Sequence, residues 1–281
     1  MVWTEITRRD YRRDGLRYAS DVTPAEWAVI ESFLPRPRRL GRPRSVDLRA
    51  VVDAILYVLA TGCQWRALPK DMPPRSTVQG YFYAWRDAGL WRRINATLVA
   101  CVRLGMGRTG VPSAGVIDSQ SVKTTESGGP RGFDAAKRIK GRKRHIVSDT
   151  QGLLLDLQVH PANIQDNHGA VPLLSSLRAA FPKLRHIFAD RVYRGDKLLM
   201  AIGGPDEWTI EIVTRSESIG TFKAERKRWV VERTFAWFGR CRRLAKDFEA
   251  SIASAEAWIM IASVRLLSRR IGKAINAKGI F

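Results

Sequence analysis

Three acidic side chains have the type and placement that metal-dependent phosphate chemistry requires. Asp118 and Asp190 each end a short apolar run, and Glu232 is the only carboxylate between positions 226 and 243, a stretch with seven Lys and Arg residues. Carboxylate oxygens are ligands that Mg²⁺ prefers, and Mg²⁺ keeps open positions for water and phosphate oxygens. Two such ions can activate the attacking oxygen and stabilise the leaving one. The three acids therefore predict a site for phosphoryl transfer.

Each acid also has an ordinary structural interpretation. An aspartate at the end of a strand is a common turn residue. Glu232 has the spacing for an i,i+4 ion pair with Arg228 on an exposed helix face. The local pattern leaves these alternatives open. The metal-site hypothesis is favoured only because the elements that carry the three acids are expected to bring them together.

Those elements have the pattern of a mixed α/β domain beginning at residue 114. Short apolar runs predict strands, and apolar residues spaced three or four apart predict helices. Asp149 is expected in the turn of a hairpin, and Asp166 as a helix N-cap. The last helix, with Glu232, is expected to pack across the two strands that end in aspartate. The predicted order is three strands, helix, strand, helix, strand, helix: 114–118, 144–149, 153–159, 166–180, 184–190, 196–202, 208–213 and from 226.

The first part of the chain is predicted to be helical. Thr23 and Pro24 mark a helix start, and Ser76 is expected to cap a later helix. Short helices joined by tight turns, with basic residues between them, fit a helix-turn-helix-like DNA-binding module. A small helical bundle without DNA contact fits the pattern too. The four helices are expected to run from 24 to before Pro35, over 47–60, over 77–88 and over 90–104.

These patterns predict four parts in the chain: a polar arm at 1–18, a helical DNA-binding domain at 19–104, a linker at 105–113 and a catalytic domain at 114–281. The linker contains a Gly-x-Gly-x-x-Gly match. The dinucleotide fingerprint needs a strand before this match and a helix after it. A helix precedes it here and Pro112 follows, so we reject a dinucleotide cofactor.

Composition narrows the class of partner. The chain has 281 residues, a net charge of +21 and a pI near 10.7. Such an excess of cations implies a polyanionic partner, with nucleic acid as the default. The sequence contains no uncharged apolar run of membrane-spanning length. Three distant cysteines and four histidines without metal-ligand spacing indicate reduced thiols in a cytoplasmic protein and no zinc site.

Several cations are candidates for contact with a DNA backbone. Two of them flank the acid of the last helix, and a structural ion pair is the alternative role for both. Four more form a cluster where a loop enters a strand, and for these a solvated charge run is the alternative. The candidates are Arg228, Arg233 and Arg240 near Glu232, and Lys140, Arg142, Lys143 and Arg144 in the cluster.

The chain resembles bacterial insertion-sequence transposases of the DDE type, the group numbered five, which is related to group four. The resemblance rests on the blocks GVIDSQSVK, GRKRHIVSDTQG, NIQDNHGA, FADRVYRGDKL and RWVVERTFAWFGRCRRLAKDFE. The stretch from ILYVLATGCQWRALP to YFYAWRDAGLWRRI resembles the helical domain that precedes the catalytic domain in that family.

The resemblance implies an α/β catalytic domain with an RNase H-like mixed sheet flanked by helices, preceded by a small all-α, helix-turn-helix-like domain. It carries the catalytic and metal-binding roles onto Asp118, Asp190 and Glu232. The implied cofactor is Mg²⁺, with Mn²⁺ as a substitute. The implied partner is double-stranded DNA, both the terminal inverted repeats and the target, bound by a homodimer. A nucleoid-associated protein in the bacterial cytoplasm is expected.

The last block departs from the family pattern at two positions. The family has Tyr, Arg, Glu and Lys there at fixed spacing; Arg228 and Glu232 fit, but Glu225 replaces the Tyr and Gly239 the Lys. Arg240 is the candidate to replace the lysine. Two other functions stay open: an RNase H-like nuclease without strand transfer, and a non-catalytic DNA-binding derivative of a transposase.

Overall fold

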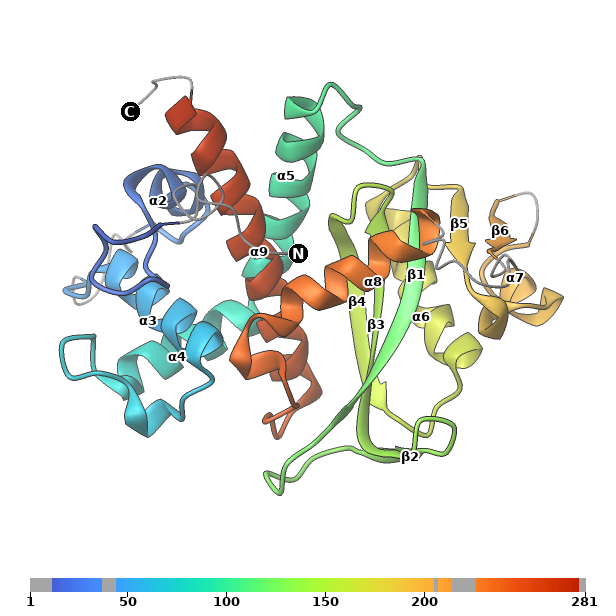
Figure 1. The fold of residues 1–281 in the computed structure, drawn as a ribbon, viewed down its shortest axis with the longest axis horizontal. Coiled ribbons are helices and arrows are strands. Elements are labelled where there is room, and N and C mark those ends of the chain that lie inside the picture. Colours follow the sequence, from blue (N-terminus) through green and yellow to red (C-terminus); the bar gives the residue numbers. More distant parts are fainter. Residues whose placement is uncertain (1–11, 37–43, 205–206, 214–225, 278–281) are drawn as a thin grey trace, which may run out of the picture.

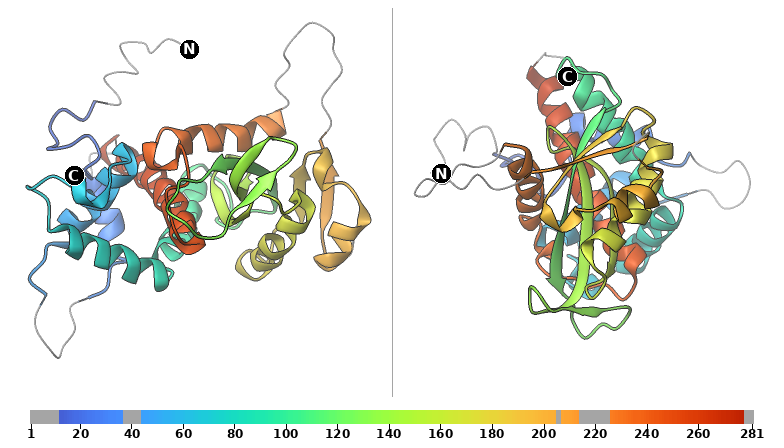
Figure 2. Two further views of the ribbon diagram at one scale, coloured as in Figure 1. Left: turned by 90° about the horizontal axis from the view of Figure 1, so that it is seen from below. Right: turned by 90° about the vertical axis from the view of Figure 1, so that its right-hand side faces the viewer.

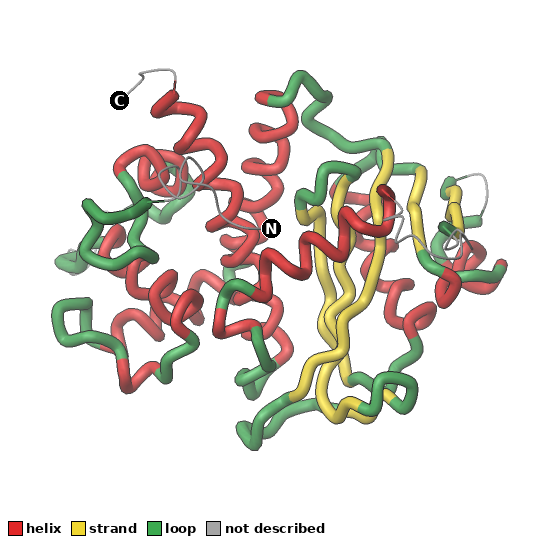
Figure 3. Tube along the Cα trace, viewed as in Figure 1, coloured by secondary structure: helices red, strands yellow, loops and turns green. Residues whose placement is uncertain are grey.

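The computed structural model describes residues 12–36, 44–204, 207–213 and 226–277, and the side chains within these ranges except those of 226–228. A helical region and a sheet region lie side by side (Figures 1 and 3). The elements are α2 (Pro24–Glu31), α3 (Leu48–Thr61), η1 (Trp65–Ala67), α4 (Arg75–Asp87), α5 (Leu90–Gly105), β1 (Ala114–Lys123), β2 (Gly132–Asp134), β3 (Ile139–Asp149), β4 (Leu154–Pro161), α6 (Asp166–Ala180), β5 (His186–Ala189), η2 (Arg191–Tyr193), α7 (Asp196–Ala201), β6 (Thr209–Ile212), α8 (Arg226–Gly239), η3 (Arg242–Leu244) and α9 (Ile252–Ala277).

The sheet is mixed, with β1 at its centre. β3 pairs antiparallel with β1, and β4 pairs antiparallel with β3. On the other side, β5 runs parallel to β1, and β6 runs parallel to β5. Helices α8 and α6 cover opposite faces of this sheet (Figure 2, left). The predicted α/β class with an RNase H-like mixed sheet flanked by helices is confirmed, as is the helical region before it.

Helix α9 joins the two regions and was not predicted from the sequence. It packs against α2, α3, α4 and α5 of the helical region and against β4 of the sheet. Its central residues, from Trp258 to Val264, are all buried. The buried apolar residues of both regions form one continuous core. The C-terminal helix thus completes the N-terminal helical region, and the division at 105–113 stays a prediction.

Local sequence signals explain several element boundaries. Thr23 caps α2 as predicted, because its hydroxyl accepts from the Glu26 N–H while Glu26 accepts from the Thr23 N–H. The predicted Ser76 cap is wrong: α4 begins at Arg75, two residues before the predicted start, and has no side-chain cap. Helix α6 has the predicted bounds, but its N-cap is Gln165, so Asp166 lies inside the first turn.

The hairpin between β3 and β4 has Asp149 at its turn, as predicted, with a further role. Its Oδ1 accepts from the backbone N–H groups of Gln151 and Leu153, which closes the turn. Its Oδ2 forms a buried ion pair with Arg103 of α5. Asp149 therefore connects the sheet to the helical region. Among the described residues, no helix is both long and apolar enough to cross a membrane.

Candidate active site

Asp118 lies in the middle of β1 and not at its end, so the predicted strand end is wrong. Residues Ser119 to Lys123 continue the strand because they pair with His145 to Gly141 of β3. The Ser119 hydroxyl donates to Asp166 of α6, so Ser119 faces α6. Side chains alternate along a strand, which places Asp118 on the opposite face, where α8 packs. Asp118 is half-buried, and its Oδ1 accepts from the Ser119 N–H at 2.7 Å.

Asp190 directly follows β5, as predicted, and is half-buried. Its Oδ1 accepts from the Val192 N–H at 2.8 Å, which caps η2. The parallel register pairs Val116 of β1 with Phe188 of β5. Two residues further along both chains, the same register brings Asp118 alongside Asp190. The two aspartates thus occupy matching positions where β5 ends.

The buried phenol of Tyr193 supports this convergence. Burial raises the pKa of Tyr193 well above its usual value, and the charges of Asp118, Asp166 and Asp190 raise it further. A carboxylate affects a phenol in this way only at short range. Both predicted catalytic aspartates therefore act electrostatically on one buried phenol.

Glu232 lies on α8 with an exposed side chain. One flank of α8 faces the β3–β4 hairpin, because Thr234 donates to the Gly152 carbonyl and Arg233 to the Gln151 carbonyl. Successive residues are about 100° apart around a helix, so Glu232 lies on the flank opposite Thr234. The same helix also packs against β1 and β5. Glu232 therefore projects from the side of α8 that is away from the hairpin.

The three acids provide an oxygen-only donor set, which suits Mg²⁺. Two of them, Asp118 and Asp190, are positioned together by strand register. Within the described residues, however, no group of three or more His, Cys, Asp or Glu side chains is close enough to hold an ion. The structure thus builds the aspartate pair, and the approach of Glu232 to that pair stays a prediction.

Comparison with known proteins places this sheet and its acids in a family. The model of a family described as "Transposase DDE domain" matches residues 109–267, which is more than half of the chain. The chain belongs to the DDE transposase family. A second model, described as "Putative transposase of IS4/5 family", matches residues 22–95. This description joins groups four and five, so it does not separate the two groups.

Curated relatives point to insertion elements. The transposase is 34% identical over 108 residues, 36% of its own length and 72% of the relative's, to "Insertion element IS402 uncharacterized 16.2 kDa protein" of Burkholderia cepacia. It is 29% identical over 141 residues to "Putative transposase for insertion sequence element IS402" of the same organism, covering 48% of this chain and 64% of the relative. No solved structure matches.

Behind the aspartate pair, the transposase has a polar network centred on Asp166. Its Oδ1 accepts from the Ser119 hydroxyl and the Lys143 ammonium, each at 2.9 Å, and lies 3.3 Å from His145 Nε2. Burial alone would raise the pKa of Asp166, but the bonds from His145, Lys143 and Ser119 outweigh it, and the pKa is lowered. Because Ser119 also holds Asp118, the network positions a predicted catalytic acid. The sequence signal for this network was Asp166 in the NIQDNHGA block.

His145 lies at the base of this network with a fully buried side chain. Its ring is 4.8 Å from the ring of His160, in an edge-on arrangement. Burial lowers the pKa of His145, although the bond to Asp166 acts in the opposite direction. A Cβ at position 169 of α6 would collide with the present position of the His160 ring, so Gly169 allows α6 to lie close to the sheet. The network therefore depends on close packing of α6 against the sheet.

Three members of the predicted DNA-binding cluster are buried, and their assignment to DNA is wrong. Arg142 is fully buried and pairs with Asp247 at 3.1 Å. The guanidinium of Arg144 donates to the carbonyls of Leu244 and Lys246. Lys143 is held by Asp166, as described above. Their charged groups are buried and bonded within the protein, so they do not form a surface for a DNA backbone. Lys140 is exposed, and its predicted role stays open.

The other candidate cations lie on or after α8. The Arg233 guanidinium lies between the rings of Trp229 and Trp237, 4.6 and 4.7 Å from their centroids. These ring contacts and the hydrogen bond to the Gln151 carbonyl show that Arg233 helps to pack α8 against the β3–β4 hairpin. A contact between Arg233 and a DNA phosphate stays a prediction. Arg240 is exposed. The side chain of Arg228, like Glu225, lies outside the described residues.

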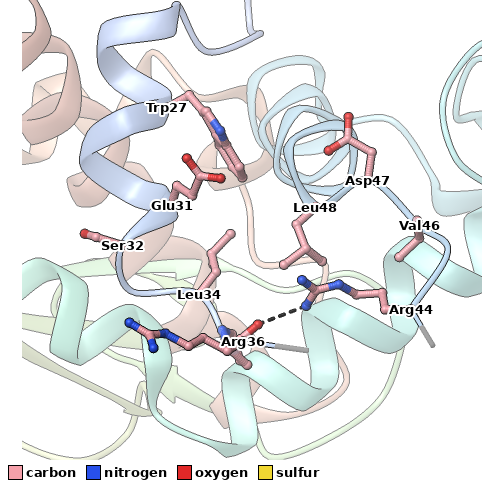
Figure 4. Close-up of a pocket in the computed structure, with 10 residues that line it drawn as sticks. Trp27, Glu31, Ser32, Leu34, Arg36, Arg44, Val46, Asp47 and Leu48 are labelled. Carbon is pink, nitrogen blue, oxygen red and sulfur yellow. Dashed lines mark hydrogen bonds between the residues drawn. The ribbon is translucent and has the colours of Figure 1, made fainter. Parts of the chain in front are cut away.

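An open pocket of about 570 Å³ lies in the helical region, where α2 ends and α3 begins (Figure 4). Arg44 donates to the Pro35 carbonyl at its rim. Its wall combines Trp27, Leu34 and Leu48 with charged residues of both signs. The pocket holds none of the three acids. This pocket is therefore separate from the half-buried aspartates of the sheet.

Proposed function

We propose that this transposase cuts DNA at the terminal inverted repeats of an insertion sequence and joins the freed 3′-OH ends to target DNA. The observation that carries the proposal is the aspartate pair. Asp118 and Asp190 lie at matching positions in the register of adjacent parallel strands, in a chain of the DDE family. Two carboxylates at neighbouring strand positions can share the metal ions that phosphoryl transfer requires.

In this proposal the chain's own residues hold and orient the reacting phosphate. The Ser119 and Val192 N–H groups fix one oxygen each of Asp118 and Asp190. Both acids and Glu232, once α8 brings it close, would hold Mg²⁺, or Mn²⁺ in its place. When bound, the metal ions stabilise the charge on the attacking and leaving oxygens. Asp118 and Asp190 therefore need fixed rotamers, which their backbone bonds provide.

The proposal extends to the DNA complex. A net charge of +21 favours a duplex with many phosphates, and binding of this kind weakens steeply with salt. A homodimer would hold the two ends of one element together during joining. These statements rest on the charge and on the family, and the following experiment tests their catalytic basis.

The test uses a labelled duplex built from the DNA that flanks the reading frame, with Mg²⁺ added. Asp118→Asn and Asp190→Asn should abolish cleavage and joining but keep end binding, because an amide keeps the shape and removes the charge. Asp196→Asn is the matched control, since Asp196 is an exposed aspartate six residues after Asp190. A fully active Asp118→Asn protein would overturn the assignment.

Pre-cut ends separate transposition from simple hydrolysis. A transposase should join a supplied 3′-OH end to a target plasmid without a preceding cut. An enzyme that nicks DNA with Mg²⁺ but never joins pre-cut ends would be a nuclease, which contradicts strand transfer. A protein that binds the ends but neither nicks nor joins would be a non-catalytic derivative.

A further inference from the structure

The hairpin formed by β2 and the start of β3, residues 131–140, projects from the lower end of the sheet in Figure 1. We call it the basic hairpin. Its base is tightly packed: a Cβ at Gly132 would collide with Asn163, and one at Gly141 with the Val122 carbonyl. Asp134 accepts from the Ser121 hydroxyl at 2.6 Å. The basic hairpin is therefore a fixed part of the sheet.

Its outer face combines an aromatic ring with cations. Phe133 pairs with Lys140 across the two strands and is 55% exposed. Arg131, Arg138 and Lys140 are exposed, whereas Asp134, the acid of the hairpin, is turned inward and buried. Glu126, 3.8 Å from Arg131, is an exposed acid at its edge. This face combines positive charge with an apolar surface.

Arg138 adds an independent observation from the backbone. Its φ of +52° lies in the left-handed region, and no other non-glycine residue in the described ranges has a positive φ. This region favours glycine, because a Cβ there approaches the following carbonyl. Strained residues of this kind concentrate at functional positions. A long cation kept at the tip of the turn points to a function for its exposed guanidinium.

The basic hairpin lies on the same face of the sheet as Asp118. Asp118 pairs with Ile146 of β3, and Lys140 is six residues before Ile146 on that strand. Even-numbered β3 side chains share one face, and six residues of strand span about 20 Å. At 3.4 Å per base pair, this distance corresponds to roughly six base pairs of duplex. Lys140 and Asp118 therefore share one face of the sheet, and residues 242–250 pack over Arg142 and Arg144 between them. A duplex that contacts both ends would pass over this segment.

We propose that the basic hairpin is a DNA-contact surface distinct from the acids, on which Arg138 and Lys140 neutralise backbone phosphates and Phe133 packs into the adjoining groove. The inference rests on the proposed function, since it assumes a duplex at the acids. The occupant is duplex DNA because the chain carries a net charge of +21 and this face combines exposed cations with the exposed ring of Phe133. Proteins are known to bind a duplex with cations on the DNA backbone and an apolar side chain in the groove.

The test measures binding without cleavage. In an Asp118→Asn background, fluorescence anisotropy gives the Kd for a duplex from the element end and for an unrelated duplex of equal length, over a series of salt concentrations. One variant combines Arg138→Gly with Lys140→Gln, and a second carries Phe133→Ser. The matched control combines Lys183→Gln with Arg185→Gln, two exposed cations at the opposite end of β1.

The hairpin double variant should raise Kd about tenfold near 0.1 M salt and reduce the salt slope by about 1.8, the value for two lost phosphate contacts. Phe133→Ser should raise Kd and leave the slope unchanged. Arg138→Gly relieves the left-handed backbone, so an unchanged or higher Tm of this variant excludes unfolding as the cause.

Different failures have different meanings. If the Asp118→Asn protein binds neither duplex, the proposed function fails, and this inference fails with it. If that protein binds DNA and the hairpin variants bind equally well with the same slope, only the hairpin inference is overturned. Equal losses in the hairpin and control variants would also overturn it, because the effect would then be one of total charge.

Discussion

Two neighbouring groups of cations, one in the turn before β3 and its first residues and one within β3, have opposite environments in this transposase. Arg138 and Lys140 are exposed, whereas Arg142 and Arg144, two and four residues further along, are buried. The sequence KRIKGRKR does not distinguish them. Residues 242–250, which follow α8, cover Arg142 and Arg144 and leave Arg138 and Lys140 exposed. A run of basic residues is therefore not evidence of a DNA-binding surface until its burial is known.

The buried group has most of its charged atoms bonded inside the protein. Besides Asp247, Arg142 contacts the carbonyls of Pro130 and Ala250. Burial lowers the pKa of Arg144 to about 10, so it stays charged at neutral pH. A buried charge is tolerated only when its donors are paired, and removal of one partner costs more than the pair contributes. We therefore expect the buried cations to control stability and the exposed ones to control DNA affinity.

The largest expected effect comes from Arg142→Met. It leaves Asp247 buried without its partner and should lower the free energy of unfolding by about 3–5 kcal/mol. Urea denaturation followed by circular dichroism measures this. Lys140→Met is the control and should change stability by less than about 0.5 kcal/mol. Adding Asp247→Leu to Arg142→Met should recover part of the loss. Equal stability of the two Met variants would contradict the comparison.

Lys143→Met should have the next largest effect, about 2 kcal/mol, because Asp166 loses a charged hydrogen-bond donor. It should also move acid unfolding to higher pH. The pKa of Asp166 is lowered in the folded protein, so its contribution is present above the unfolded pKa of about 4 and is lost as pH falls. Loss of the Lys143 bond reduces the contribution of Asp166 to stability. An unchanged acid midpoint would show that Lys143 does not control Asp166.

His145 predicts a smaller effect, visible in the dependence of stability on pH. Its folded pKa is lowered by burial, so its contribution is present above the unfolded pKa of about 6.5 and is lost as pH falls below that value. The slope is at most about 1.4 kcal/mol per pH unit. His145→Gln should flatten the decline between pH 7 and 5. The exposed His168→Gln should leave it intact. The pKa of His160 is also lowered, so part of the dependence of stability on pH should remain in the His145→Gln variant.

Arg138→Gly should have the smallest effect on stability and the opposite sign. Relief of the left-handed backbone outweighs the added freedom of glycine in the unfolded chain, for a gain of about 0.5 kcal/mol. Thermal unfolding monitored by calorimetry measures it against wild type. A clear loss of stability would mean that the Arg138 side chain holds the turn together. Arg138 would then have a structural role, like the buried Arg142 and Arg144.

Prediction from sequence succeeded where the signal was local. The bounds of α6 and the aspartate after β5 follow from apolar spacing and a short buried strand. It failed at Asp118, because Ser119, Gln120 and Ser121 resemble a turn. Pairing with β3 makes them strand, and this pairing joins residues about 25 apart. Helix α9 was missed, although its apolar pattern is continuous.

The sequence by itself determined the family, the order of most strands and helices, and the three carboxylates that are predicted to hold a metal. These follow from residue types and short-range periodicity. Only the tertiary structure decided that Arg142 and Arg144 are buried and bonded inside the protein, that Asp166 supports Ser119 beside Asp118, and that α9 completes the helical region. Each of these depends on which segments distant in the chain pack together. Burial then sets the role of a charge, because the same guanidinium binds a phosphate at the surface and an internal carboxylate beneath it.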